Sequence, residues 1–259
     1  RVGDAGSRHV SFKQASAFLQ RCRRRPERMR LLCSTAAARE GGDRLSVSVE
    51  VAPRGPSVAV QEISMADGWT GCRFSPSALW LALELGQDAT LRAAVEGGRR
   101  PRVLELGCGV ALAGLAAHAL GCDTTLTDCL PGHLQNLQGV CARRPQDAGK
   151  LRVRCLDWQE EVSRLASSRC HVDTGSPENG GAAAAAALAA GVGVERLARE
   201  EERSFDLVLA SDVLYEEHHA ELLPLVIERW LRPGGRWLLA LAVRDADMLV
   251  RFLERMGAA

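Results

Sequence analysis

Two glycines and an acid lie close together in the segment RVLELGCGVALAG, residues 102–114. Backbone N–H groups at a strand-to-helix turn favour anions, so dinucleotide-binding proteins place a pyrophosphate there with the spacing GxGxxG. That spacing would need glycine at position 112, which is Leu112. Glu105 precedes Gly107 by two positions, where its carboxylate favours a cationic ligand group over a phosphate. We predict that Glu105, Gly107 and Gly109 bind such a ligand; the alternative is that the glycines only allow close strand–helix packing.

Asp128 and Asp157 end the next two predicted strands, and Trp158 follows at once. Ligands of open α/β sheets bind outside the carboxyl ends of the strands, so these side chains are expected beside the glycine turn. Asp128 can accept both hydroxyls of a ribose, Asp157 an adenine amino group, and Trp158 can lie against the ring. A ligand that combines a ribose and an adenine with a cationic group fits all of these side chains. S-adenosylmethionine is such a ligand, because it carries a sulfonium and an α-ammonium. The alternative is an aspartate that caps a helix and a tryptophan in the core.

The fourth predicted strand ends in SDVLYEEHH, residues 211–219. Asp212 and Tyr215 are three positions apart and can both face the ligand, so we predict them as catalytic residues, with Ser211 at the cofactor. The alternative is that Asp212 caps the following helix and Tyr215 packs beneath it. His218 and His219 are adjacent rather than one helical turn apart, so the sequence predicts no metal pair.

These residues need a scaffold in which strands and helices alternate, and the pattern from residue 102 onward provides one. The alternation of short strand-like and helix-like segments predicts strands at 102–106, 123–128, 151–157, 205–212 and 236–243. Helical spacing predicts helices at 112–120, 132–144, 216–231 and 246–256. Strands separated by crossover helices indicate an α/β fold with a doubly wound, mainly parallel sheet. Such sheets often close with an antiparallel pair, and we expect these C-terminal strands to be missing.

The N-terminal part has a different pattern. Residues 45–52 and 56–64 alternate apolar and polar side chains around ProArgGlyPro, which predicts a β-hairpin. Pro76 after Ser75 predicts the start of a helix over 75–85. We therefore divide the chain into an extension, 1–66, with a basic helix and the hairpin, and a catalytic domain, 67–259. Within that domain, 167–204 contains GGAAAAAALAAG and is expected to be a low-complexity insertion.

Composition excludes several classes of protein. The formal net charge is +1, so no overall field gathers nucleic acid. The run RCRRRPERMR is expected to be a solvated helical face, with a nucleic-acid or organelle-targeting patch as the alternative. No stretch reaches the roughly 18 apolar residues that a membrane span needs. Nine cysteines, none spaced as CxxC, indicate free thiols in a reducing compartment rather than a zinc site, so we expect a cytoplasmic protein.

The motifs VLELGCG, LTD, LDW and FDLVLASDVLY, followed by ProGlyGly, occur in the order typical of one family. The chain resembles the seven-strand S-adenosylmethionine-dependent methyltransferases, and more narrowly the protein-lysine methyltransferase group with an Asp/Glu-x-x-Tyr/Phe motif after the fourth strand. The resemblance covers residues 68–256 and includes Thr70 and Gly71 before the first helix. The sequence departs from the family pattern at Phe74 and Pro76, where tryptophan and proline are usual, and at Ala111, where the family has a third glycine.

The resemblance implies transfer of a methyl group from S-adenosylmethionine to a lysine of a protein substrate such as a chaperone or translation factor. In this reading Asp212 accepts hydrogen bonds from the lysine amine and Tyr215 lines its channel. The chain is expected to act as a monomer, without membrane or nucleic acid. The alternatives are methylation of a protein histidine or of a small molecule, and a non-catalytic interaction module with the same fold.

Overall fold

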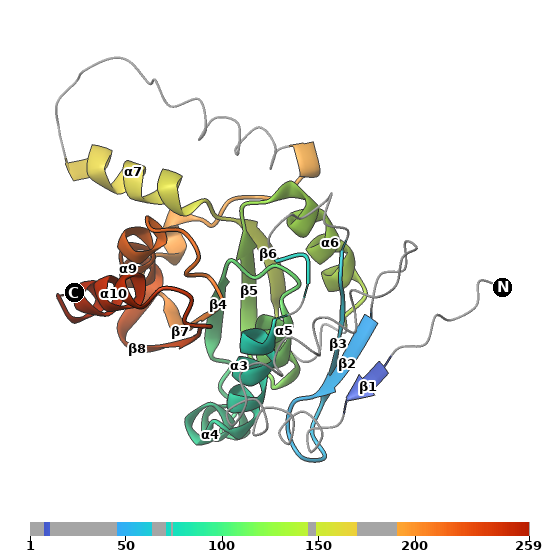
Figure 1. Cartoon of the computed structure of the whole chain (residues 1–259). Helices are drawn as coiled ribbons and strands as arrows, with labels where there is room; N and C mark the ends of the chain where they lie inside the picture. Colours follow the sequence, from blue (N-terminus) through green and yellow to red (C-terminus); the bar gives the residue numbers. More distant parts are fainter. Residues whose placement is uncertain are drawn as a thin grey trace.

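A computed structural model describes residues 8–10, 46–63, 71–73, 75–144, 149–169 and 191–258 (Figure 1). Its centre is a five-stranded sheet in the order β6-β5-β4-β7-β8, with every neighbouring pair parallel. The strands are β4 (Arg102–Leu106), β5 (Asp123–Asp128), β6 (Leu151–Cys155), β7 (Phe205–Ser211) and β8 (Leu231–Ala240). The chain runs outward from β4 in one direction and then returns to fill the other, which confirms the doubly wound parallel sheet. The point where the direction changes is where such sheets bind ligands.

Helices cover both faces of this sheet, which explains why its central strands are apolar on both sides. Side chains alternate along β4 and β7, so Val103 and Leu207 face one helical layer while Leu104 and Val208 face the other. The first layer contains α3 (Pro76–Gln87), α4 (Ala89–Glu96), α5 (Leu112–Ala119) and α6 (Pro131–Ala142). The second contains α7 (Trp158–Arg169), α9 (His219–Trp230) and α10 (Ala246–Ala258).

The predicted start of the helix after Ser75 is confirmed. Ser75 is the N-cap of α3, and its hydroxyl accepts the backbone N–H of Ala78 at 3.0 Å. Pro76 occupies the first helical position, where a missing N–H costs no helical hydrogen bond. Helix α3 packs on α5 and brings the segment before it to the edge of the sheet where the strands end.

The predicted β-hairpin is confirmed by β2 (Ser46–Glu50) and β3 (Ser57–Gln61), which pair antiparallel. A short strand, β1 (Arg8–Val10), adds to β2 in parallel. Val49, Val58 and Val60 are buried in the same cluster as Leu112 and Leu115 of α5. The hairpin therefore packs on the helix that follows the glycine turn. The basic segment 12–33, with RCRRRPERMR, lies outside the described residues.

Several elements differ from the sequence predictions, among them α4 and α7, which no predicted helix covers. β8 begins at Leu231 rather than 236, because Leu231 pairs with Phe205 and a register shift then leaves the ProGlyGly segment as a bulge. α9 begins at His219 rather than 216, after a turn. Of the predicted insertion 167–204, residues 170–190 lie outside the described ranges, but its last part is ordered: Cys155 at the end of β6 pairs with Arg196, and Val194 is buried.

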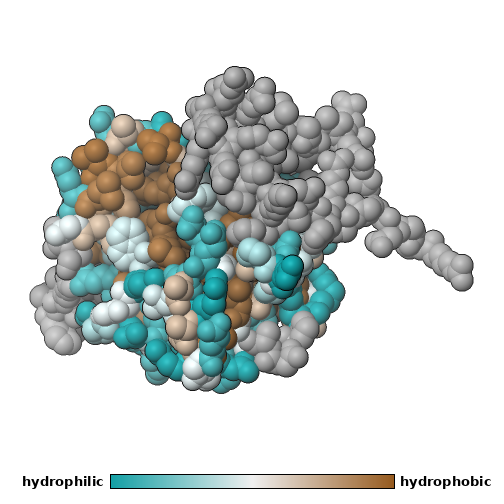
Figure 2. All heavy atoms as spheres, turned by 90° about the horizontal axis from the view of Figure 1, so that it is seen from below, coloured by the Kyte–Doolittle hydropathy of each residue, from teal (hydrophilic) through white to brown (hydrophobic). Residues whose placement is uncertain are grey.

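One side of the molecule is notably apolar. Figure 2 shows hydrophobic side chains gathered on the side where β8 and α10 lie. Val243, Val250 and Leu253 are each more than half exposed. Among the described residues, no helix combines the length and apolar character needed to cross a bilayer.

Candidate active site

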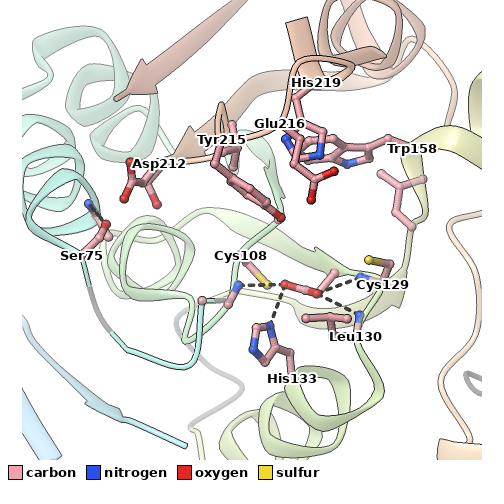
Figure 3. Close-up of a pocket in the computed structure, with 18 of the residues that line it drawn as sticks. Ser75, Cys108, Cys129, Leu130, His133, Trp158, Asp212, Tyr215, Glu216 and His219 are labelled. Atoms are coloured by element: carbon pink, nitrogen blue, oxygen red, sulfur yellow. Dashed lines mark hydrogen bonds and ion pairs between the residues drawn. The ribbon is translucent and has the colours of Figure 1, made fainter. Parts of the chain in front are cut away.

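A cavity of about 590 Å³ opens at the carboxyl ends of the central strands. This volume is within the range of small-molecule sites, which is roughly 300–1,000 Å³. Eight of the nine predicted site residues line it: Gly107, Gly109, Asp128, Asp157, Trp158, Ser211, Asp212 and Tyr215. Residues far apart in the sequence therefore meet at one site, as the strand-end argument predicted (Figure 3).

The glycine turn after β4 forms the floor of the cavity. Gly107 and Gly109 have φ angles of +57° and +52°, a left-handed conformation that glycine adopts without steric cost. A Cβ atom on Gly109 would lie 2.6 Å from the carbonyl oxygen of Gly71, so the segment before α3 can approach only because residue 109 is glycine. Ala111 also has a left-handed φ, +60°, at the position where the resembling family has a third glycine.

Asp128 fixes this turn. Its Oδ2 accepts the N–H of Gly109 at 3.0 Å and lies 3.1 Å from Nδ1 of His133. Its Oδ1 accepts the N–H groups of Cys129 and Leu130 at 2.9 and 3.0 Å. Burial alone would raise the pKa of Asp128, but the bond and charge of His133 and the backbone donors outweigh it and lower that pKa. Asp128 is thus held as a carboxylate whose two oxygens already have partners.

Glu105 is the ninth predicted site residue, and the structure corrects its position. It is fully buried beneath the turn and does not line the cavity. Because side chains alternate along a strand, Glu105 shares the face of Val103 and points into the layer of α5, where its Oε2 accepts the N–H of Gly114 at 2.9 Å. Its Oε1 has no hydrogen-bond partner among the described residues, and burial raises its pKa to about 8.

Asp157 and Trp158 stand at the start of α7. Asp157 Oδ1 accepts the N–H groups of Gln159 and Glu160 at 2.9 and 3.1 Å, so it caps the helix as the alternative interpretation held. Both residues also line the cavity. The Trp158 ring meets the ring of His219 edge to face at 5.3 Å, which joins α7 to the start of α9.

The turn after β7 forms another wall of the cavity. Asp212 has a φ of +57°, which is uncommon for a residue other than glycine and typical of strained functional positions. Its Oδ2 accepts a hydrogen bond from Arg244 at 2.6 Å, whereas its buried Oδ1 has no partner among the described residues. Tyr215 is 41% exposed and packs against His219 with ring centroids 4.5 Å apart. Asp212 therefore does not cap α9, and Tyr215 is not buried beneath it.

Sequence reasoning missed several residues of the cavity, including Gly71, His133, Glu216 and Arg244. His133 left a weak signal, because a histidine in the first turn of the helix after Asp128 faces back toward the strand end. Arg244 left none, since its contact with Asp212 joins the loop after β8 to the loop after β7.

One family model and several solved structures are similar to this chain. The model of a family described as lysine methyltransferase matches residues 71–174, which include the glycine turn, Asp128 and Asp157. Solved structures similar to the chain include the 16S ribosomal RNA methyltransferase RsmC from T. thermophilus, solved with AdoMet and guanosine (16% identity, 85% of this chain and 48% of that one, TM-score 0.44).

Two further similar structures are the CcbJ methyltransferase from Streptomyces caelestis (16% identity, 57% of this chain and 47% of that one, TM-score 0.33) and the PH0226 protein from Pyrococcus horikoshii (14% identity, 61% and 57%, TM-score 0.35). The chain spans less than two thirds of the length of each of these three proteins.

The cofactor that the family match implies is S-adenosylmethionine, and the cavity fits it. The left-handed turn at Gly107 and Gly109 keeps side chains off the floor, the Trp158 ring provides an apolar surface, and Asp157 offers a carboxylate to a polar or cationic group. Leu112 stands where a dinucleotide site needs glycine. The sheet, the turn and the match over residues 71–174 identify this chain as one with the fold and the cofactor of the S-adenosylmethionine-dependent methyltransferases.

Proposed function

We propose that this chain transfers a methyl group from S-adenosylmethionine to the ε-amine of a lysine in a protein substrate. The observation that carries the proposal is the position of Asp212: a residue with a left-handed backbone and one unpartnered carboxylate oxygen, on the cavity wall formed by the turn after β7. The lysine methyltransferase family match over residues 71–174 supports lysine as the acceptor.

The floor of the cavity and the wall at α7 would hold the cofactor. Gly107 and Gly109 allow close approach to the main chain, Asp157 and Ser211 offer polar groups, and Trp158 offers a flat apolar surface. Asp128 acts on the turn itself, since it binds the N–H of Gly109, and so positions the cofactor. When bound, S-adenosylmethionine supplies a methyl group made electrophilic by its sulfonium.

The wall after β7 would receive the acceptor. A free lysine has a pKa near 10.4, and its amine must lose a proton before it can attack. Partial burial and the positive charge of a bound sulfonium would lower that pKa, against the opposing effect of the Asp212 carboxylate, and the proton would pass to solvent. Asp212 can then accept hydrogen bonds from the amine and turn its lone pair toward the floor, while Tyr215 lines the entrance.

Asp212 must first release its present partner. Its Oδ2 is covered by Arg244 and its Oδ1 is closed off from solvent, so the acceptor amine has to displace the half-exposed Arg244 guanidinium. Alignment of amine and methyl group would supply most of the acceleration, for which intramolecular reactions allow roughly 7–11 kcal/mol.

The experiment is transfer of a labelled methyl group to proteins in a cell lysate, followed by digestion and identification of the labelled residue. Label on lysine that is lost with Asp212→Ala supports the proposal. Asp245→Asn is the matched control, because Asp245 lies beside Arg244, does not line the cavity, and caps α10 in a way that asparagine can reproduce. Label on histidine or on small molecules would show that these, and not lysine, are the acceptor. Cofactor binding without transfer would favour a non-catalytic module.

A further inference from the structure

Three potential metal ligands converge in the turn between β7 and α9. Glu216, His218 and His219 each place one ligand atom within 4.8 Å of the other two. The two histidine rings lie 4.5 Å apart, and Glu216 Oε2 lies 3.4 Å from Nδ1 of His218. Figure 3 shows Glu216 and His219 on the same wall of the cavity as Tyr215.

This convergence differs from the sequence expectation, which rested on a helix beginning at residue 216. On a continuous helix, adjacent side chains diverge by about 100°. In the structure His218 is the N-cap and His219 is the first helical residue, while Glu216 belongs to the preceding turn. The turn brings the three side chains back toward one another.

A second observation points to a ligand at the same place. His219 is 7% exposed, and its Nδ1 has no hydrogen-bond partner among the described residues. A buried polar atom without a partner is uncommon in native proteins, and an unseen ion is one of its ordinary causes.

We propose that Glu216, His218 and His219 bind a divalent transition-metal ion, Zn²⁺ first among them. Two imidazoles and one carboxylate are a common set of zinc ligands, and they leave the fourth position open to water. Zinc–nitrogen bonds of 2.0–2.1 Å place neighbouring ligand atoms of a tetrahedral site about 3.3 Å apart. The site therefore has to contract, and Glu216 and His218 are exposed enough to rotate while His219 stays fixed by its packing.

The ligands flank the turn that carries the candidate acceptor residues. Tyr215 immediately precedes Glu216, and its ring rests on the ring of His219. A bound ion would tie this turn to the start of α9 and so make the acceptor wall more rigid. Metal binding by itself requires neither cofactor nor acceptor.

The test is titration of the whole chain with Co²⁺, an optical substitute for Zn²⁺, followed by displacement with Zn²⁺. We expect one ion per chain, an absorption spectrum without thiolate-to-cobalt charge transfer, and at least about tenfold weaker binding in Glu216→Gln and in His218→Ala. Both positions are exposed, so these variants are expected to fold. Glu217→Gln, in the same turn but outside the cluster, and Cys129→Ser, which removes the exposed thiol at the cavity, should bind as the wild type does. Equal binding by wild type and His218→Ala, or loss of binding in Cys129→Ser, would overturn the proposal.

Amide hydrogen exchange locates the ion independently. Saturating Zn²⁺ should slow exchange over residues 212–219 in the wild type and in Glu217→Gln, but not in His218→Ala. Unchanged exchange over this segment in the wild type would contradict the site. Because neither experiment contains cofactor or substrate, their outcome is independent of the proposed methyl transfer.

Discussion

Asp128 ends β5 and Asp212 follows β7, the two strands that flank β4, and both residues line the same cavity, but their surroundings are opposite in kind. Asp128 is nearly buried and its two oxygens share four nitrogen partners. Asp212 sits in a left-handed backbone conformation, with one oxygen bound to a half-exposed arginine and the other without a partner.

The difference shows how one cavity can have two kinds of wall. A fully hydrogen-bonded carboxylate holds the surrounding backbone in one conformation, which suits a surface that must bind the same cofactor each time. A carboxylate with an unpartnered oxygen, on a strained backbone, can still accept a hydrogen bond from an incoming group. This is what a residue that binds the acceptor requires. Changes at Asp212 should therefore act on transfer, and changes around Asp128 on the cofactor and on stability.

The largest effect is expected at Asp212. Asp212→Ala removes the acceptor oxygens and the charge, and we expect the rate of transfer to fall by about 10²–10³, as for the loss of one well-placed polar group in other enzymes. The affinity for S-adenosylmethionine should stay near that of the wild type. Single-turnover transfer and calorimetric titration of the cofactor measure the two quantities separately.

Alanine at this position need not disturb the fold. Ala111 already adopts a left-handed conformation in this chain, and asparagine tolerates it well. Asp212→Asn, which keeps one acceptor oxygen, should fall between Ala and wild type. Loss of cofactor affinity equal to the loss of rate would contradict the division between the two walls.

The second prediction concerns the floor of the cavity. A Cβ at Gly109 would approach the Gly71 carbonyl oxygen to 2.6 Å, and its φ of +52° is costly for alanine. Gly109→Ala should therefore destabilise the fold by about 2–4 kcal/mol, from backbone strain and overpacking together. It should also weaken cofactor binding, since it shifts the turn that Asp128 holds.

Gly98→Ala is the matched control. Gly98 also has a positive φ, +77°, but no atom lies within 4 Å of its Cβ position. This variant should be destabilised only by the strained backbone conformation, by about 1–2 kcal/mol, and its cofactor affinity should be unchanged. Urea denaturation and calorimetry provide the comparison, and equal losses in the two variants would mean that the contact with Gly71 is unimportant.

Much of the scaffold could be predicted from the sequence, because buried parallel strands impose a simple pattern. The limits of β4 and β5 agree with the predicted strands, and every residue after the first is buried because helices cover both faces. The start of α3 was also predictable, because Ser75 and Pro76 act locally. The start of α9 was not, because nothing in the residues 216–218 distinguishes a helical turn from the irregular one observed.

The site itself was predictable only in part. Strand ends brought Asp128, Asp157 and Asp212 together, as topology requires. The prediction for Glu105 was wrong because it rested on the sequence distance to the glycines. The alternation of side chains along β4 places Glu105 on the face toward α5, beneath the glycine turn. Contacts such as that of Arg244 with Asp212 join two loops, and only the folded chain shows them.

Glu105 gives the third prediction, a pH effect on stability without a direct role in the cavity. Its folded pKa of about 8 lies above its ordinary value, so the folded state retains a proton that the unfolded chain has lost. The free energy of unfolding should therefore fall as the pH rises toward 8. The pKa of His219 is lowered from its ordinary value of 6.5, so below pH 6.5 His219 makes the free energy of unfolding rise with pH. The effect of Glu105 is therefore measured most clearly between pH 6.5 and 8.

Glu105→Gln removes this proton but retains a carbonyl oxygen for the N–H of Gly114. Between pH 6.5 and 8, the free energy of unfolding of the wild type should fall by on the order of 2 kcal/mol more than that of the variant, because each pH unit corresponds to 1.36 kcal/mol. Urea denaturation across this range measures the difference between the slopes. Parallel slopes would show that Glu105 is ionised throughout the window.

The smallest effect is expected at Arg244. Its ion pair with Asp212 is exposed on the arginine side, and such pairs contribute less than about 1 kcal/mol to stability. Arg244→Ala should therefore leave the Tm almost unchanged, as should Arg255→Ala, which breaks a similarly exposed pair with Glu221 outside the cavity.

The two arginine variants should differ in kinetics. If the guanidinium has to leave before a lysine amine can reach Asp212, its removal should lower KM for the acceptor by about threefold to tenfold, a gain of up to about 1.4 kcal/mol. Arg255→Ala should leave that KM unchanged. A higher KM in Arg244→Ala would mean that Arg244 holds the acceptor rather than competing with it. Asp212 would then differ from Asp128 in hydrogen bonding only at its Oδ1 atom, which has no partner among the described residues.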